Sequence, residues 1–80
     1  MNTQQYAYLG TIIKIRYYQP DPYEVGGYHW EVYKNGSKLS DSSKQYSEDT
    51  VEQALFRAKQ AADFHLDTDS DKQPVLLMSD

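Results

Sequence analysis

The 80-residue sequence contains no cysteine. This absence excludes disulfide bonds, zinc–thiolate sites and thiol catalysis, and it argues against a secreted mini-protein held together by disulfides. Long apolar runs are missing too, whereas a membrane span needs about 18 or more apolar residues in succession. The N-terminal residues show no basic segment followed by an apolar one. We therefore expect no signal peptide, no membrane association and a cytoplasmic location.

Basic residues are in the minority. The chain has 12 Asp and Glu against 8 Lys and Arg, which gives a formal net charge of −4 at pH 7. Proteins that bind nucleic acid directly usually carry a basic stripe that neutralises phosphates. The acidic balance therefore argues against direct nucleic-acid binding and favours a partner with a basic surface.

Sequence motifs of catalysis are also absent. The chain has no G-x-S-x-G elbow, no phosphate-cradling glycine loop and no G-x-G-x-x-G fingerprint. His29 and His65 are its only histidines, and no short spacing makes them joint metal ligands. A chain of this length also has little room for a deep pocket. We expect a protein that is not an enzyme and that needs no cofactor.

One acidic cluster does have a metal-binding spacing. Asp67, Asp69 and Asp71 are spaced like the first ligands of a helix-loop-helix calcium site. That site also needs a glycine and a bidentate glutamate, and the corresponding positions hold Lys72 and Met78. We interpret the segment as a solvated acidic turn without a metal.

Alternating apolar and polar residues predict strands in the first half of the chain. The length indicates a single domain over residues 1–80. Period-two alternation predicts one half-buried strand over Ala7–Tyr17, with the odd positions inward, and a second strand over Tyr28–Lys34. The segment between them is rich in proline and glycine, which predicts a loop over residues 19–27.

The Asn35-Gly36 pair predicts a type I′ hairpin turn, because both central residues of that turn need positive φ. A two-residue turn places Val32 opposite Leu39 in the next strand, which we expect over residues 37–45. This strand is polar and rich in serine. We expect it at the edge of the sheet, with a twist or bulge before Asp41 that discourages edge-to-edge pairing.

Helical periodicity appears in the second half. Apolar residues recur at i, i+3, i+4 and i+7 spacing from Val51 to Leu66, and Ser47 is the expected N-cap. An apolar run over residues 74–78 predicts a short buried strand, placed parallel to the first strand by a right-handed return. The expected fold class is α+β. It consists of a three-stranded antiparallel meander, one helix packed on one face and a short fourth strand, in the order 3-2-1-4.

Tyrosines are unusually numerous: the chain has eight of them, with one tryptophan and two phenylalanines. The alternation places Tyr17, Tyr28 and Trp30 in the core. The other tyrosines near the strands fall on the second sheet face or in the loop: Tyr6, Tyr8, Tyr18, Tyr23 and Tyr33. Exposed tyrosines suit a protein interface, because they bury a large area at low entropic cost. The alternative is that they form cross-strand pairs that only stabilise the sheet.

Two phenylalanines, Phe56 and Phe64, line up on the side of the helix that faces away from its apolar stripe. They cannot both belong to the core between helix and sheet. Either the N-terminal arm or the last loop covers them, or they form a small apolar patch for a partner or a second copy of the chain.

The order of elements has a likeness among small proteins. Residues 28–63 read Y-H-W-E-V-Y-K-N-G, then a polar strand, then S-E-D-T-V-E-Q-A-L-F-R-A-K-Q-A-A-D. This segment resembles the strand–turn–strand–helix layout of small bacterial proteins and of compact phage-encoded inhibitors, anti-CRISPR proteins among them. The resemblance covers about half of the chain and implies an inhibitor of phage or mobile-element origin, but it carries over no functional residue.

These features predict a small acidic protein-binding module that docks on a basic, nucleic-acid-like groove of a larger protein. One alternative is a structural or regulatory homodimer joined through the phenylalanines or the edge of strand 37–45. A second is a single-stranded nucleic-acid binder that stacks bases beside Lys14 and Arg16, against which the net charge argues. The residues expected to bind the partner are acidic or aromatic: Asp21, Tyr23, Glu24, Tyr33, Phe56, Asp63, Phe64, Asp67, Asp69 and Asp71.

Overall fold

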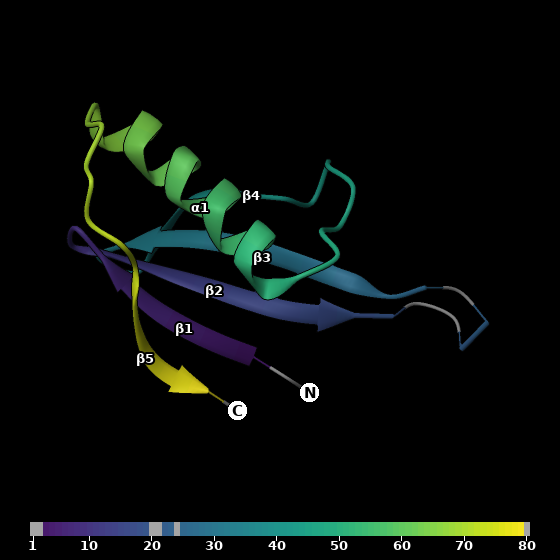
Figure 1. Cartoon of the computed structure of the whole chain (residues 1–80). Helices are drawn as coiled ribbons and strands as arrows, with labels where there is room; N and C mark the ends of the chain where they lie inside the picture. The colour runs from purple at the N-terminus through teal and green to yellow at the C-terminus, as the bar shows by residue number, and fades with distance from the viewer. Residues whose placement is uncertain (1–2, 20–21, 24, 80) are drawn as a thin grey trace.

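The computed structural model describes residues 3–19, 22–23 and 25–79. It shows an antiparallel sheet with a helix across one face, which confirms the α+β class (Figure 1). In chain order the elements are β1 (Thr3–Tyr8), β2 (Thr11–Tyr18), β3 (Gly27–Lys34), β4 (Ser37–Asp41), α1 (Val51–Leu66) and β5 (Val75–Ser79). The five strands lie in the order β4-β3-β2-β1-β5, and each neighbouring pair is antiparallel.

The expected long first strand is instead a hairpin of β1 and β2. Leu9 and Gly10 form its two-residue turn, with φ of 48° and 80°. Leucine seldom adopts positive φ, and for this reason the turn was missed in the sequence. The turn pairs Tyr8 with Thr11, so the inward side chains change from even positions in β1 to odd positions in β2.

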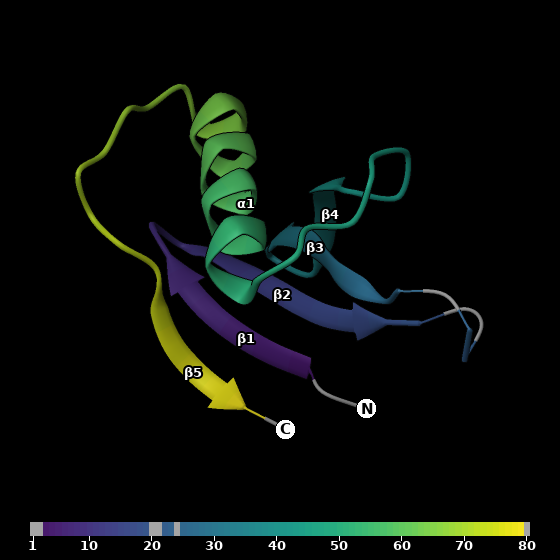
Figure 2. The ribbon, with the colours of Figure 1, turned by 45° about the vertical axis from the view of Figure 1, so that its right-hand side comes forward.

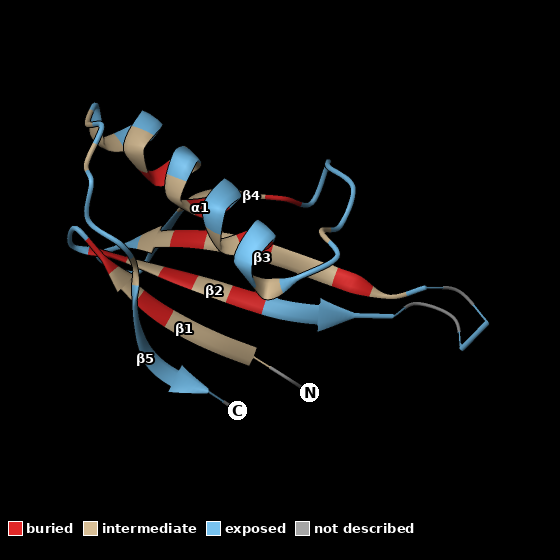
Figure 3. Cartoon of the chain, in the orientation of Figure 1, coloured by how far each residue is buried: buried red, intermediate tan, exposed pale blue. Residues whose placement is uncertain are grey.

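The core lies between α1 and the sheet face that the helix covers (Figure 3). Three alanines on one side of α1 lie in this layer, and the helix packs on β2, β3 and β4 (Figure 2). Small side chains allow a helix to approach a sheet closely. The buried hydrophobic residues are Tyr6, Tyr8, Ile13, Ile15, Trp30, Val32, Ala54, Ala58 and Ala62.

Three tyrosine predictions were wrong, and the missed hairpin explains two of them. Tyr6 and Tyr8 were expected on the outer face or in a loop, but they point into the core, with exposures of 9% and 2%. Tyr17 was expected in the core and is 37% exposed. It packs edge-on against half-buried Tyr28, with ring centroids 5.2 Å apart.

The second hairpin follows the sequence closely. The turn at Asn35-Gly36 is confirmed, with φ of 52° and 81°. The expected bulge is also present, and it places Ser40, not Leu39, opposite Val32. β4 lies at the sheet edge as expected, but it ends at Asp41 and does not continue to residue 45.

The helix begins at Val51, but its N-cap is Thr50 and not Ser47. The Thr50 hydroxyl accepts the backbone N–H of Gln53 at 3.1 Å. Ser47 cannot cap the helix because the adjacent Glu48 is paired with β3. Glu48 and Tyr28 exchange two backbone hydrogen bonds, at 2.8 and 3.0 Å.

The last strand differs most from the prediction. It was expected to be buried and parallel to the first strand, but β5 is exposed along its whole length and runs antiparallel to β1 (Figure 3). The extra hairpin explains the difference. β5 runs in the same direction as β2, but β1 lies between the two strands. Because α1 packs on β2, β3 and β4, β5 lies beyond the helix.

Candidate protein-binding surfaces

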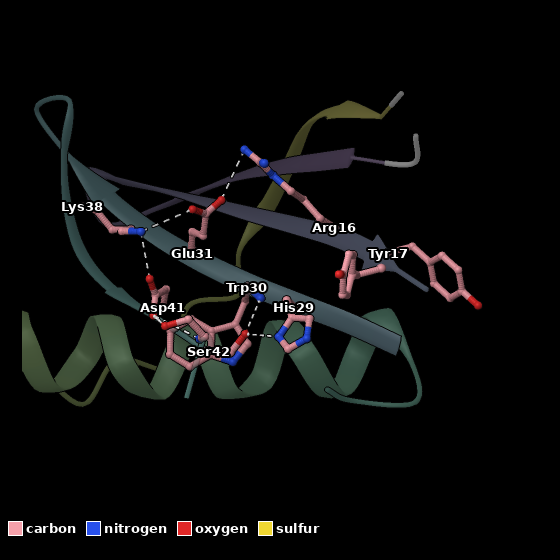
Figure 4. Close-up of a pocket in the computed structure, with 10 residues that line it drawn as sticks. Arg16, Tyr17, His29, Trp30, Glu31, Lys38, Asp41 and Ser42 are labelled. Atoms are coloured by element: carbon pink, nitrogen blue, oxygen red, sulfur yellow. Dashed lines mark hydrogen bonds and ion pairs between the residues drawn. The ribbon is translucent and has the colours of Figure 1, made fainter. Parts of the chain in front are cut away.

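A depression of about 510 Å³ lies where β2, β3 and the end of β4 meet (Figure 4). Charged side chains cross it. The Glu31 carboxylate lies 3.3 Å from Arg16 and 3.7 Å from Lys38, and the Lys38 ammonium lies 2.8 Å from Asp41. Hydrogen bonds from Lys38 and Ser43 lower the pKa of Asp41 to about 2. The negative charges of two acids and the positive charges of two basic residues therefore cancel within the depression.

His29 and Ser42 also line this depression, and their Nδ1 and Oγ atoms are 2.9 Å apart. Such a pair could activate a serine nucleophile if substrate could reach the hydroxyl. Ser42 is only 2% exposed, and its Oγ already accepts the backbone N–H of Trp30 at 2.9 Å. Its own N–H donates to the Trp30 carbonyl at 3.0 Å. We interpret the pair as a structural link that continues the β3 edge beyond β4.

Tyr33, one of the expected partner-binding residues, is half-buried and engaged within the sheet. Its hydroxyl donates to Glu31 at 3.0 Å, and the Lys14 ammonium lies 4.6 Å from its ring centroid. The hydrogen bond to Glu31, and then burial, raise the pKa of Tyr33. These contacts correspond to the sheet-stabilising alternative, so we leave Tyr33 out of the docking surface.

Asp63 was also expected to contact a partner, but its carboxylate is only 13% exposed and is already bonded. The Tyr8 hydroxyl donates to Oδ1 at 2.5 Å, and the Lys59 ammonium donates to Oδ2 at 3.2 Å. Lys59 also donates to the carbonyl of Ser70 at 2.8 Å. Asp63 therefore ties α1 to β1, and Lys59 ties the loop after the helix to the same cluster.

The C-terminal end of α1 keeps the expected exposed groups. Phe64 is 82% exposed and Phe56 is 58% exposed, so no described segment covers the outer side of the helix. Asp67 ends the helix with φ of 54°, and Asp69 and Asp71 follow in the exposed loop. Among the described residues, none of these three carboxylates forms an ion pair. We call Phe64, Asp67, Asp69 and Asp71 the helix-end surface.

The remaining expected residues come from the segment between β2 and β3. Tyr23 is 96% exposed, and Asp21 and Glu24 lie outside the described residues. The end of β2 and the start of β3 lie far from the C-terminal end of α1 in a molecule whose longest dimension is 40 Å (Figure 1). The structure therefore divides the predicted set between two ends of the molecule.

Sequence reasoning missed a third surface, the outer edge of β5. Val75, Leu76, Leu77 and Met78 are 63%, 53%, 55% and 57% exposed. A run of four apolar residues ordinarily indicates burial. Only the sheet order, which places these residues beyond the helix, shows that they reach solvent.

The part of the chain that the structure describes contains no helix long and apolar enough to cross a membrane. It also contains no group of three or more acidic or histidine side chains that could hold a metal ion, the segment from Asp67 to Asp71 included. No family model matches the chain, and neither a curated protein nor a solved structure matches it.

Proposed function

We propose that this protein is a small acidic, non-catalytic module that docks on a basic surface of a larger protein through the helix-end surface. The observation that carries the proposal is the 82% exposure of Phe64 at the helix end that also bears Asp67, Asp69 and Asp71. Burying a phenylalanine side chain contributes about 1.5–3 kcal/mol. Aromatic anchors of this kind often dominate the affinity of an interface.

The electrostatics of the helix end favour a basic partner. The last carbonyl groups of a helix carry a partial negative charge. The final turn of α1 has only His65 as a basic residue, and Asp67 adds a full negative charge at the cap. A lysine or arginine of a partner would complement this pole, and the net charge of −4 would speed the encounter.

A more specific hypothesis is that the partner surface is a groove that normally holds nucleic acid. In this form the protein is an inhibitor of phage or mobile-element origin, similar to anti-CRISPR proteins, whose carboxylates take the place of phosphates. Its small size, its acidity and its order of elements support the hypothesis.

The test is capture of proteins from a bacterial lysate by the wild type and by two matched variants. The variant Phe64→Ser/Asp69→Asn removes one exposed aromatic and one acid from the helix-end surface. The control Tyr46→Ser/Asp49→Asn also removes one exposed aromatic and one acid, at positions before the helix. We expect one captured protein that is lost with the first variant, retained with the control and released by salt. Equal capture by both variants would contradict the proposal.

The inhibitor hypothesis has its own readout. An oligonucleotide added to the captured complex should displace the module if both occupy the same groove. Retention of the module at saturating oligonucleotide would exclude the nucleic-acid groove and leave docking on another basic surface.

A further inference from the structure

We propose that two copies of the chain associate through β5, with the two β5 strands pairing antiparallel to join both sheets into one. β5 pairs with β1 on one side, and no described strand pairs with its other side. An edge strand presents a row of N–H and C=O groups that can pair with another strand. All five residues of this edge strand are exposed, and the four from Val75 to Met78 are apolar.

The distribution of charge indicates that the partner at this edge is a second copy. Neither β1 nor β5 contains a charged residue, whereas β2, β3 and β4 each contain at least one. Two copies with a net charge of −4 repel each other over most approaches. The two uncharged strands at this side of the sheet let identical chains meet with the least repulsion, and an apolar strand is complementary to itself.

The opposite edge of the sheet, β4, is protected against pairing with another strand, whereas β5 is not. β4 carries Lys38 and Asp41 and is bulged at Leu39. Charged side chains and bulges are the usual devices that prevent edge-to-edge pairing. β5 has an irregularity around Leu77, but it has no charge.

The geometry leaves room for the second copy. α1 packs on β2, β3 and β4, so the helix does not stand above β5 (Figure 2). A two-fold axis relates the two β5 edges antiparallel to each other. Both edges are then paired, so association stops at a dimer. The irregularity at Leu77 shortens the regular pairing, so we expect a reversible dimer of micromolar affinity.

This inference does not depend on the proposed docking function. The helix-end surface lies at the end of α1 and in the loop before β5, outside the strand that pairs, so a dimer would carry two copies of it and the docking module would be bivalent. The two proposals also respond oppositely to salt. Screening should strengthen association of two acidic copies and weaken docking on a basic partner.

The test is sedimentation equilibrium of the wild type from micromolar to millimolar concentration, at low and high salt. The mass should rise from 9.3 kDa towards twice that value, and more readily at high salt. Leu76→Lys/Met78→Lys should weaken association at least about tenfold, because like charges then face each other across the edge. The control Gln45→Lys/Tyr46→Lys adds the same charge at exposed positions after β4 and should associate like the wild type or more strongly.

Three results would overturn the inference. The wild type could stay at 9.3 kDa at every concentration. Assembly could continue beyond two copies. The dimer could survive the β5 variant, and its loss with Phe56→Glu/Phe64→Glu would then place the contact on the helix. If the β5 variant does not fold, hydrogen exchange of the wild type tests the pairing instead. The β5 amides should exchange more slowly as the protein concentration rises. Unchanged exchange rates would refute the pairing.

Discussion

Replacing Tyr8 by phenylalanine removes a single hydroxyl whose role the structure defines. The Tyr8 hydroxyl donates to the Asp63 carboxylate at 2.5 Å, and the residue is 2% exposed. Phenylalanine keeps the packing of the ring. It leaves Asp63 with the Lys59 ammonium as its remaining described partner, at 3.2 Å.

The expected cost follows from the type of bond that is lost. A hydrogen bond to a charged acceptor contributes about 1.5–3 kcal/mol to stability. The Asp63 side chain is only 13% exposed, so water replaces the missing donor poorly. We expect Tyr8→Phe to lower the free energy of unfolding by about 2 kcal/mol, which for a domain of this size is a fall in Tm of about 10 °C.

The pH dependence gives an independent check of the same bond. Burial, and then the hydrogen bond to Asp63, raise the pKa of Tyr8 above its ordinary 10.0. A raised pKa in the folded state means that the stabilisation is fully present below pH 10.0 and is lost as the pH rises through the folded value. The stability difference between wild type and Tyr8→Phe should therefore be constant at neutral pH and shrink in strong alkali.

Urea denaturation followed by circular dichroism measures this difference. The control is Tyr46→Phe, the same chemical change at a residue that is 98% exposed, and it should stay within about 0.5 kcal/mol of the wild type. The reasoning fails if Tyr8→Phe is as stable as that control. It also fails if Asp63→Asn weakens partner capture without lowering stability, which would return Asp63 to the docking surface.

Three further predictions concern the Asn35-Gly36 turn, the edge strand β4 and the sheet face that bears Lys14 and Arg16. Asn35→Val/Gly36→Val should lower stability in urea by about 1–3 kcal/mol per position, because β-branched residues resist the observed φ of 52° and 81°. Asp41→Asn should cost about 1 kcal/mol above pH 3.8, after allowance for solvent screening, and the difference should vanish in an acid titration as the pH falls through about 2. Fluorescence anisotropy with a single-stranded oligonucleotide near physiological salt should show no binding, because Lys14 and Arg16 already contact Tyr33 and Glu31. Micromolar binding that is lost with Arg16→Ala would contradict the last prediction.

Elements with strong local signals could be predicted from the sequence. The Asn35-Gly36 turn has the residues that its backbone requires, and the helix over Val51–Leu66 has a periodic apolar stripe. The turn at Leu9-Gly10 has the same backbone requirement but places leucine where φ is 48°. The Leu9-Gly10 pair therefore does not predict a turn, and β1 and β2 were interpreted as one strand.

That single omission also explains the error in β5. α1 packs mainly on β2, β3 and β4 and reaches β1 at Tyr8, so the extra strand leaves β5 outside the part of the sheet that the helix covers. Hydrophobicity alone predicts burial for the segment from Val75 to Met78. Its exposure depends on how many strands separate it from the helix, which is a property of the whole fold.

The candidate site shows the same division between local and distant determinants. Asp63 and Asp67 are equivalent in the sequence, both acidic and both near the helix end. Their roles differ because Tyr8, which is 55 residues from Asp63 along the chain, donates a hydrogen bond to one and not to the other. The exposure of Phe64, in contrast, follows from its position opposite the alanine stripe and was predictable.

Hydrogen exchange of the module bound to its captured partner tests the central claim most directly, because it locates the contact on the chain itself. Docking through the helix-end surface predicts slower amide exchange over residues 64–71 in the complex than in the free protein, with the open face of β2 and β3 unchanged. Unchanged exchange over residues 64–71, with protection confined to other elements, would contradict the claim.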